Sequence, residues 1–161
     1  MNGVGMHRIA LWAGLIFVLD QASKWAVVQF LNLKEIGDYD LVPPYLVFRM
    51  AWNQGVNFGL LSNDTEVTRW ALVAVALGIS AWVFLWVRRE GGPWAEIAAG
   101  MLIGGALGNV VDRVVYGAVA DFLNMSCCGF DNPYSFNVAD IAIFAGALGL
   151  VFFGNPRGKT S

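Results

Sequence analysis

The stretch Phe136–Phe153, FNVADIAIFAGALGLVFF, indicates the fold of this chain most directly. Asp140 is its single charged residue, and the apolar run that follows, Ile141–Phe153, has 13 residues. At about 1.5 Å per residue, a helix of that length does not cross a hydrocarbon core about 30 Å thick. A membrane span here must therefore contain Asp140 or hold it at the boundary. A carboxylate at that depth is costly, so it indicates a functional site.

The composition of the whole chain also indicates a membrane protein. Of its 161 residues, 57% are hydrophobic and 14% are charged, whereas ordinary soluble domains carry about 25% charged residues. The length leaves room for one domain, 1–161. The net charge of -2 and the single histidine, His7, argue against a nucleic-acid surface, an HExxH zinc site and Ser/His or Cys/His catalysis. We expect no metal, no cofactor and no nucleic-acid partner.

Four apolar stretches predict an all-α membrane protein with four transmembrane helices. The predicted spans are about 9–31, 70–87, 94–115 and 136–153, which leaves outer loops 32–69 and 116–135. Because basic residues favour the cytoplasmic side, we expect both termini to be cytoplasmic. The basic residues that would share that side are Arg8, Arg88, Arg89, Arg157 and Lys159.

The first outer loop is apolar and aromatic for a segment in solvent. Residues 45–52 are typical of a strand, 53–55 of a turn and 56–61 of a second strand. We therefore expect a small β-hairpin that lies in the headgroup layer and cradles a substrate.

Asp121 and Asp140 are the candidate catalytic residues. The predicted topology brings both to the outer face at one depth, although they are 19 positions apart. Two carboxylates held close share one proton, so one can activate water while the other polarises a carbonyl. The ordinary alternatives are a solvated loop aspartate at position 121 and a carboxylate favoured by the helix dipole at position 140.

Two further polar pairs have helical spacing. Asp20 and Lys24 are four residues apart in the first span and can form an ion pair, which favours structural support over proton relay. Asn109, Asp112 and Arg113 lie at the outer end of the third span, where Asn109 and Arg113 share a face. These three residues could hold a substrate or join helices, and both interpretations stay open.

Three glycines in the third span are spaced four apart. Gly100, Gly104 and Gly108 form a doubled GxxxG pattern, which permits close approach of a second helix and implies no chemistry.

Four motifs together resemble one family, the lipoprotein signal peptidases or signal peptidase II. Their order and topology match over nearly the whole chain, with one departure at Asn57, where a small residue is commoner. The motifs are Asp20-Gln21-Ala22-Ser23-Lys24, Asn53-Gln54-Gly55 with Phe58-Gly59, Gly108-Asn109-Val110-Val111-Asp112-Arg113 with Gly117 and Asp121-Phe122, and Phe136-Asn137-Val138-Ala139-Asp140.

The resemblance implies an intramembrane aspartic endopeptidase of the bacterial cytoplasmic (inner) membrane, active near its outer face. Such enzymes need no metal and remove the signal peptide from prolipoproteins, cutting before a cysteine that carries diacylglycerol. The implied partners are the lipidated prolipoprotein and membrane lipids, and we expect a monomer. The implied catalytic pair is Asp121 and Asp140, and the other motif positions fall on Asp20, Lys24, Asn53, Gly108, Asn109, Arg113, Asn137 and Ala139.

Two other classes of protein fit some of the same residues. A proton-coupled transporter or channel subunit would use Asp20, Lys24, Asp112 and Asp140 as a relay, but four spans are few and no internal repeat is visible. A non-catalytic scaffold would use the glycine faces and gives no reason for Asp140.

Overall fold

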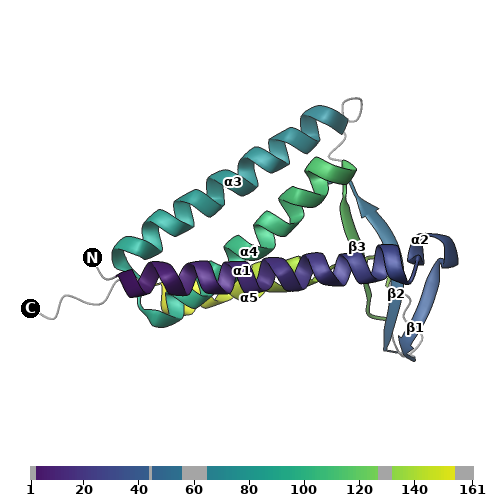
Figure 1. The fold of residues 1–161 in the computed structure, drawn as a ribbon, viewed down its shortest axis with the longest axis horizontal. Coiled ribbons are helices and arrows are strands. Elements are labelled where there is room, and N and C mark those ends of the chain that lie inside the picture. Colours follow the sequence, from purple (N-terminus) through teal and green to yellow (C-terminus); the bar gives the residue numbers. More distant parts are fainter. Residues whose placement is uncertain (1–2, 44, 56–64, 127–131, 155–161) are drawn as a thin grey trace, which may run out of the picture.

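Long helices form a bundle with a small sheet at one end, and α1 begins and α5 ends at the opposite end (Figure 1). The computed structural model describes residues 3–43, 45–55, 65–126 and 132–154. The elements are α1 Gly3–Trp25, a π-helical turn Ala26–Phe30, α2 Leu33–Ile36, β1 Asp38–Val42, β2 Leu46–Asn53, α3 Thr65–Glu90, α4 Pro93–Tyr116, β3 Val119–Asn124 and α5 Val138–Phe153.

Three helical stretches in the described part of the chain are long and apolar enough to cross a membrane. They are Gly5–Phe30, Glu66–Glu90 and Pro93–Tyr116, which correspond to the first three predicted spans with bounds that differ by one to four residues. The fourth apolar helix, α5, has 16 residues. The predicted count of four spans therefore stays a prediction.

The doubled GxxxG pattern explains why α4 lies at the centre of the bundle, in contact with α1, α3 and α5. A Cβ atom at Gly100 or Gly104 would meet the backbone of Ala13 in α1. On another face of α4, a Cβ atom at Gly105 would meet the carbonyl of Ala139 in α5. Glycine at these positions lets three backbones approach closely, which brings the polar ends of α1, α4 and α5 together.

The sheet is antiparallel with β2 at its centre, in the order β1-β2-β3. The predicted strand 45–52 agrees with β2 to within one residue. Its predicted partner, 56–61, lies outside the described residues, as does Asn57. The hairpin that the structure shows joins β1 to β2, and Tyr45 N–H closes its turn by donating to the carbonyl of Val42.

Residues 116–135, which the sequence predicts as an outer loop, contain the strand β3. Gly117 ends α4 with φ of +79°, a left-handed conformation that favours glycine. The chain then turns back along β2, and Leu123 also pairs with Phe136. Asp121 therefore lies in a strand, where backbone pairing on β2 fixes its position.

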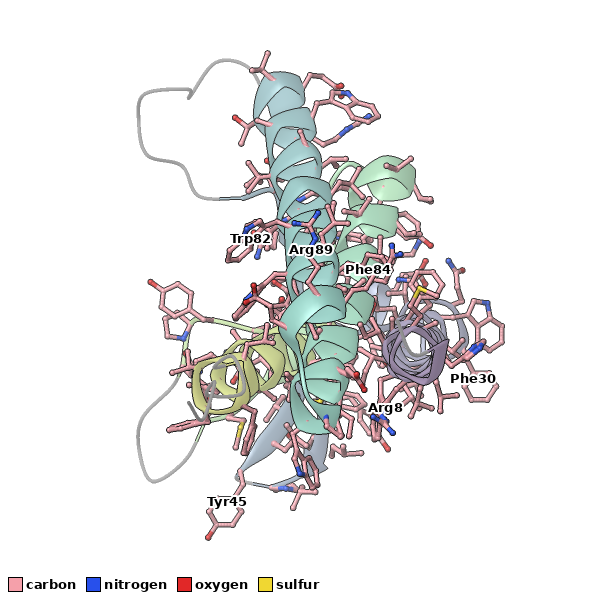
Figure 2. The ribbon with its side chains drawn as sticks, turned by 90° about the vertical axis from the view of Figure 1, so that its left-hand side faces the viewer. Arg8, Phe30, Tyr45, Trp82, Phe84 and Arg89 are labelled. Carbon is pink, nitrogen blue, oxygen red and sulfur yellow. The ribbon has the colours of Figure 1, made fainter. Side chains whose placement is uncertain are left out.

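Large apolar side chains project outward from the helices. Figure 2 shows Phe30 and Trp82 pointing away from the bundle, and they are 78% and 63% exposed. Trp82 stacks on Trp86 along α3, with ring centroids 5.6 Å apart. A helix surface this apolar needs an apolar surrounding, and the hydrocarbon core of a membrane supplies it.

Candidate functional site

Buried polar side chains gather at the sheet end of the bundle. They come from the last turns of α1, the last turns of α4, β3 and the start of α5. Among the described residues, Ser80 in α3 is the one buried polar side chain outside this group, which consists of Asp20, Lys24, Asn109, Asp112, Asp121, Asn124 and Asn137. A proton relay needs polar groups graded across the bilayer, so this distribution argues against the transporter interpretation.

Asp121 is almost fully buried in β3, with 2% of its surface exposed. Its Oδ1 accepts a hydrogen bond from Asn137 Nδ2 at 2.6 Å, and its Oδ2 accepts one from Asn53 Nδ2 at 3.0 Å. Asn53 reaches it from the end of β2, the strand that pairs with β3. The alternative that position 121 is a solvated loop aspartate is therefore wrong.

Asp140 begins α5 as part of a capping box with Asn137. Its backbone N–H donates to Asn137 Oδ1 at 2.9 Å, and its Oδ2 accepts from the backbone N–H of Asn137 at 3.2 Å. Its Oδ1 accepts from Asn109 Nδ2 in α4 at 2.9 Å. The side chain is half-buried. Asp140 thus has the ordinary helix-capping role and still leaves its carboxylate near other polar groups.

Asn137 links the two aspartates, since it bonds to a carboxylate oxygen of each. The pKa of Asp121 is raised to about 6. Burial contributes most, and the negative charge of Asp140 raises this pKa further, while hydrogen bonds from Asn53 and Asn137 lower it. The negative charge of Asp140 therefore acts on the carboxyl group of Asp121.

The ion pair expected between Asp20 and Lys24 is present, with Nζ 2.8 Å from Oδ2. Lys24 also donates to Asn109 Oδ1 at 3.1 Å. A Cβ atom at Gly108 would meet the Asp20 carboxylate, so glycine there lets α1 bring this carboxylate against α4. The other oxygen of Asp20 accepts the backbone N–H of Ala139 at 3.0 Å, which joins α1 to the start of α5.

Arg113 lies one turn beyond Asn109 and donates from Nη1 to the Asn109 carbonyl at 3.2 Å. Its Nε is buried and has no hydrogen-bond partner in the described part of the chain. A buried donor without a partner is costly, which makes Arg113 Nε an exception within this network.

Asp112 and Gln21 lie in the quoted motifs but were not given a site role from the sequence. Asp112 accepts from Gln21 Nε2 at 3.1 Å and pairs with Lys24 Nζ at 2.7 Å. The signal was present, because Gly108 and Asp112 are four apart and share the α4 face that meets α1. A charged residue one helical turn from a glycine at which two helices touch is expected to have a polar partner on the opposing helix.

Known proteins resemble this chain over most of its length. Residues 12–154 match the family model described as signal peptidase (SPase) II. The lipoprotein signal peptidase of Methylorubrum extorquens (strain PA1) is 43% identical over 89% of this chain and 81% of its own length. That of Methylobacterium radiotolerans is 41% identical, over 90% and 84%. A solved structure described as a bacterial membrane enzyme has a TM-score of 0.76 at 23% identity, covering 94% of this chain and 92% of that one, so it shares the fold.

Proposed function

Since the chain belongs to the signal peptidase II family, we propose that it is an intramembrane aspartic endopeptidase. It cleaves diacylglyceryl-modified prolipoproteins on the N-terminal side of the lipidated cysteine, with Asp121 and Asp140 as the catalytic pair. One observation carries this proposal: Asn137 hydrogen-bonds to both carboxylates. That shared neighbour supports a pair close enough to act on one peptide bond.

In the proposed mechanism, Asp121 carries the shared proton and Asp140 is the base. Asp140 accepts a proton from water, and the water oxygen attacks the scissile carbonyl carbon. Protonated Asp121 donates a hydrogen bond to the carbonyl oxygen as it gains negative charge. When the tetrahedral intermediate collapses, the proton now on Asp140 passes to the leaving nitrogen. The burial that raises the pKa of Asp121 to about 6 supports this division of roles.

The location and orientation of the chain in the membrane follow from the same function. The chain lies in the bacterial cytoplasmic membrane as a monomer with four spans and cytoplasmic termini, and its active site is near the outer face. The buried polar network lies at the sheet end, away from the start of α1 (Figure 1), which supports a site at one membrane surface. Acyl chains contribute about 0.8 kcal/mol per buried CH₂, so the lipid can hold the scissile bond in position.

The remaining motif residues have supporting roles in this proposal. Asn53 orients Asp121, Asn109 orients Asp140, and Arg113 offers its unpaired Nε to a substrate oxygen. The first outer loop lines the approach of the substrate at the end of β2, where Trp52 is exposed next to Asn53.

Processing of a lipidated prolipoprotein by the purified protein tests the proposed function. We expect cleavage just before the modified cysteine, read by mass spectrometry of the two products. The same precursor without its acyl chains should be cut at least about 10²-fold more slowly, because the positioning supplied by lipid burial is lost. Equal cleavage of both precursors, or cleavage at another bond, would contradict the proposal.

The pH dependence of turnover tests the assigned protonation of Asp121. The mechanism needs a proton on this group, whose pKa in the free protein is about 6. The value of kcat/KM should therefore fall as pH rises through about 6. The fall in kcat should come at higher pH, because bound substrate excludes water and further disfavours the charged carboxylate.

Asp40→Asn is a suitable control for this profile, because Asp40 is an exposed aspartate on β1. Its profile should coincide with that of the unaltered protein. If kcat/KM of the unaltered protein stays constant through pH 6, the assignment of the shared proton to Asp121 is wrong.

A further inference from the structure

Two buried carboxylates hold the backbone immediately before each proposed catalytic aspartate. Asp20 Oδ1 accepts the N–H of Ala139, the residue before Asp140, at 3.0 Å. Asp112 Oδ2 accepts the N–H of Ala120, the residue before Asp121, at 3.2 Å. In both contacts an aspartate oxygen accepts a backbone N–H, although Ala139 lies at the start of a helix and Ala120 lies in a strand.

The same two carboxylates are joined to each other twice by residues of α1. Lys24 Nζ lies 2.8 Å from Asp20 Oδ2 and 2.7 Å from Asp112 Oδ2. Gln21 Nε2 lies 3.1 Å from an oxygen of each carboxylate. A continuous chain of polar contacts therefore runs from Ala139 to Ala120 through these four side chains.

Burial makes this chain of contacts rigid. Asp20 and Asp112 are 0% and 1% exposed, and Lys24 is 4% exposed. Charge-assisted hydrogen bonds are stronger when water is excluded, and each group here would be costly to leave unpaired. The bonds therefore resist a change in the distance between the backbones of α5 and β3.

We propose that Asp20, Gln21, Lys24 and Asp112 form a bridge that sets the separation of the two catalytic aspartates. This inference rests on the proposed function, and it makes Asp112 a positioning residue that does not touch the substrate. A displacement of about 1 Å at a catalytic group can cost about 10²-fold in rate, so a bridge that fixes two backbones at once matters for turnover.

Asp112→Asn is the direct test. The amide oxygen can still accept from Ala120, but the charge that attracts Lys24 is gone. The charged groups around the pair are Asp20 and Lys24 of α1 and Asp112 and Arg113 of α4. The plot of kcat/KM against pH is bell-shaped, and the interval in pH between its two limbs measures the coupling of the two catalytic aspartates. Removing one nearby charge shifts both limbs in the same direction. A change in the separation of the aspartates alters the interval instead.

We expect the interval to change by at least about half a pH unit, and kcat to fall about 10²-fold with a much smaller change in KM. A merely destabilised protein would lose active molecules and keep both limbs in place, because the limb positions do not depend on how many molecules are active.

Glu96→Gln is the matched control. Glu96 of α4 pairs with Arg8 of α1 at 2.5 Å, so it also joins these two helices, but at the far end of the bundle. This variant should lower the melting temperature and leave the interval unchanged. If Asp112→Asn does not fold, Gln21→Met serves instead, because Lys24 still neutralises both carboxylates and helps the protein to fold. The variant removes the second of the two links between Asp20 and Asp112, so it should change the interval in the same direction.

The bridge would be overturned if folded Asp112→Asn protein kept both the interval and a normal kcat. The same result with Gln21→Met would overturn it where Asp112→Asn fails to fold. That result is distinct from failure of the proposed function. If the Asn variants of Asp121 and Asp140 are inactive while the Asp112 variant behaves normally, the catalytic pair stands and the bridge alone is wrong.

Discussion

Asp121→Asn and Asp140→Asn should each lower turnover of a lipidated prolipoprotein by about 10³-fold or more, while the protein still inserts and folds. Each change removes one carboxylate from a pair that acts as a unit, so neither remaining aspartate can serve as both acid and base. Single-turnover cleavage by the purified variants, with substrate in the same lipid or detergent, measures the loss directly.

Asparagine is the appropriate replacement because it keeps the shape and an acceptor oxygen. At position 140 that oxygen can still accept from the N–H of Asn137 or from Asn109 Nδ2, so the start of α5 is retained. Asp40→Asn on β1 is the control and should cleave normally. Near-normal turnover by either purified dyad variant would remove that aspartate from the mechanism.

Lys24→Met should destabilise the folded protein by about 3–5 kcal/mol. Methionine fills a similar volume, but Asp20 and Asp112 lose the ammonium that lies within 2.8 Å of both. Two buried carboxylates are then left with like charges and no cation, and one of them must take up a proton or leave the interior. Denaturant unfolding in detergent, followed by tryptophan fluorescence, measures the change.

The control for Lys24→Met is Lys34→Met. Lys34 is an exposed lysine of α2, so its loss should change the free energy of unfolding by no more than about 0.5 kcal/mol. If the Lys24 and Lys34 variants unfold at the same denaturant concentration, Lys24 does not hold the two carboxylates in the folded state.

The helices could be predicted from sequence because their signals are local. Hydropathy predicted a span over residues 94–115, and α4 spans Pro93–Tyr116. The same holds for the Asp20–Lys24 pair, since four residues along one helix fix the relation between two side chains.

The strand that carries Asp121 could not be predicted in this way. Its partner, β2, is distant in the sequence, and Asn53, which bonds to Asp121, lies 68 positions away. Strand formation at 119–124 depends on that pairing, and tertiary context decides whether so short a segment is extended or irregular. A loop was therefore the natural prediction.

The contacts of Asp112 could not be predicted for a related reason. Its partners in α1 are Gln21 and Lys24, and the Gln21 bond spans 91 positions. The contact appears only when α1 and α4 approach through their glycines. The doubled GxxxG pattern predicted the approach, but it did not predict which polar side chains would then meet.

In the proposed four-span topology, the length of α5 has a consequence for the lipid around it. Its sixteen residues rise about 24 Å, roughly 6 Å less than an average hydrocarbon core. Hydrophobic mismatch of this kind is relieved when the bilayer thins beside the short helix. Headgroups and their hydration shells would then dip toward Asp140, so the deformed leaflet itself would deliver the water that hydrolysis consumes.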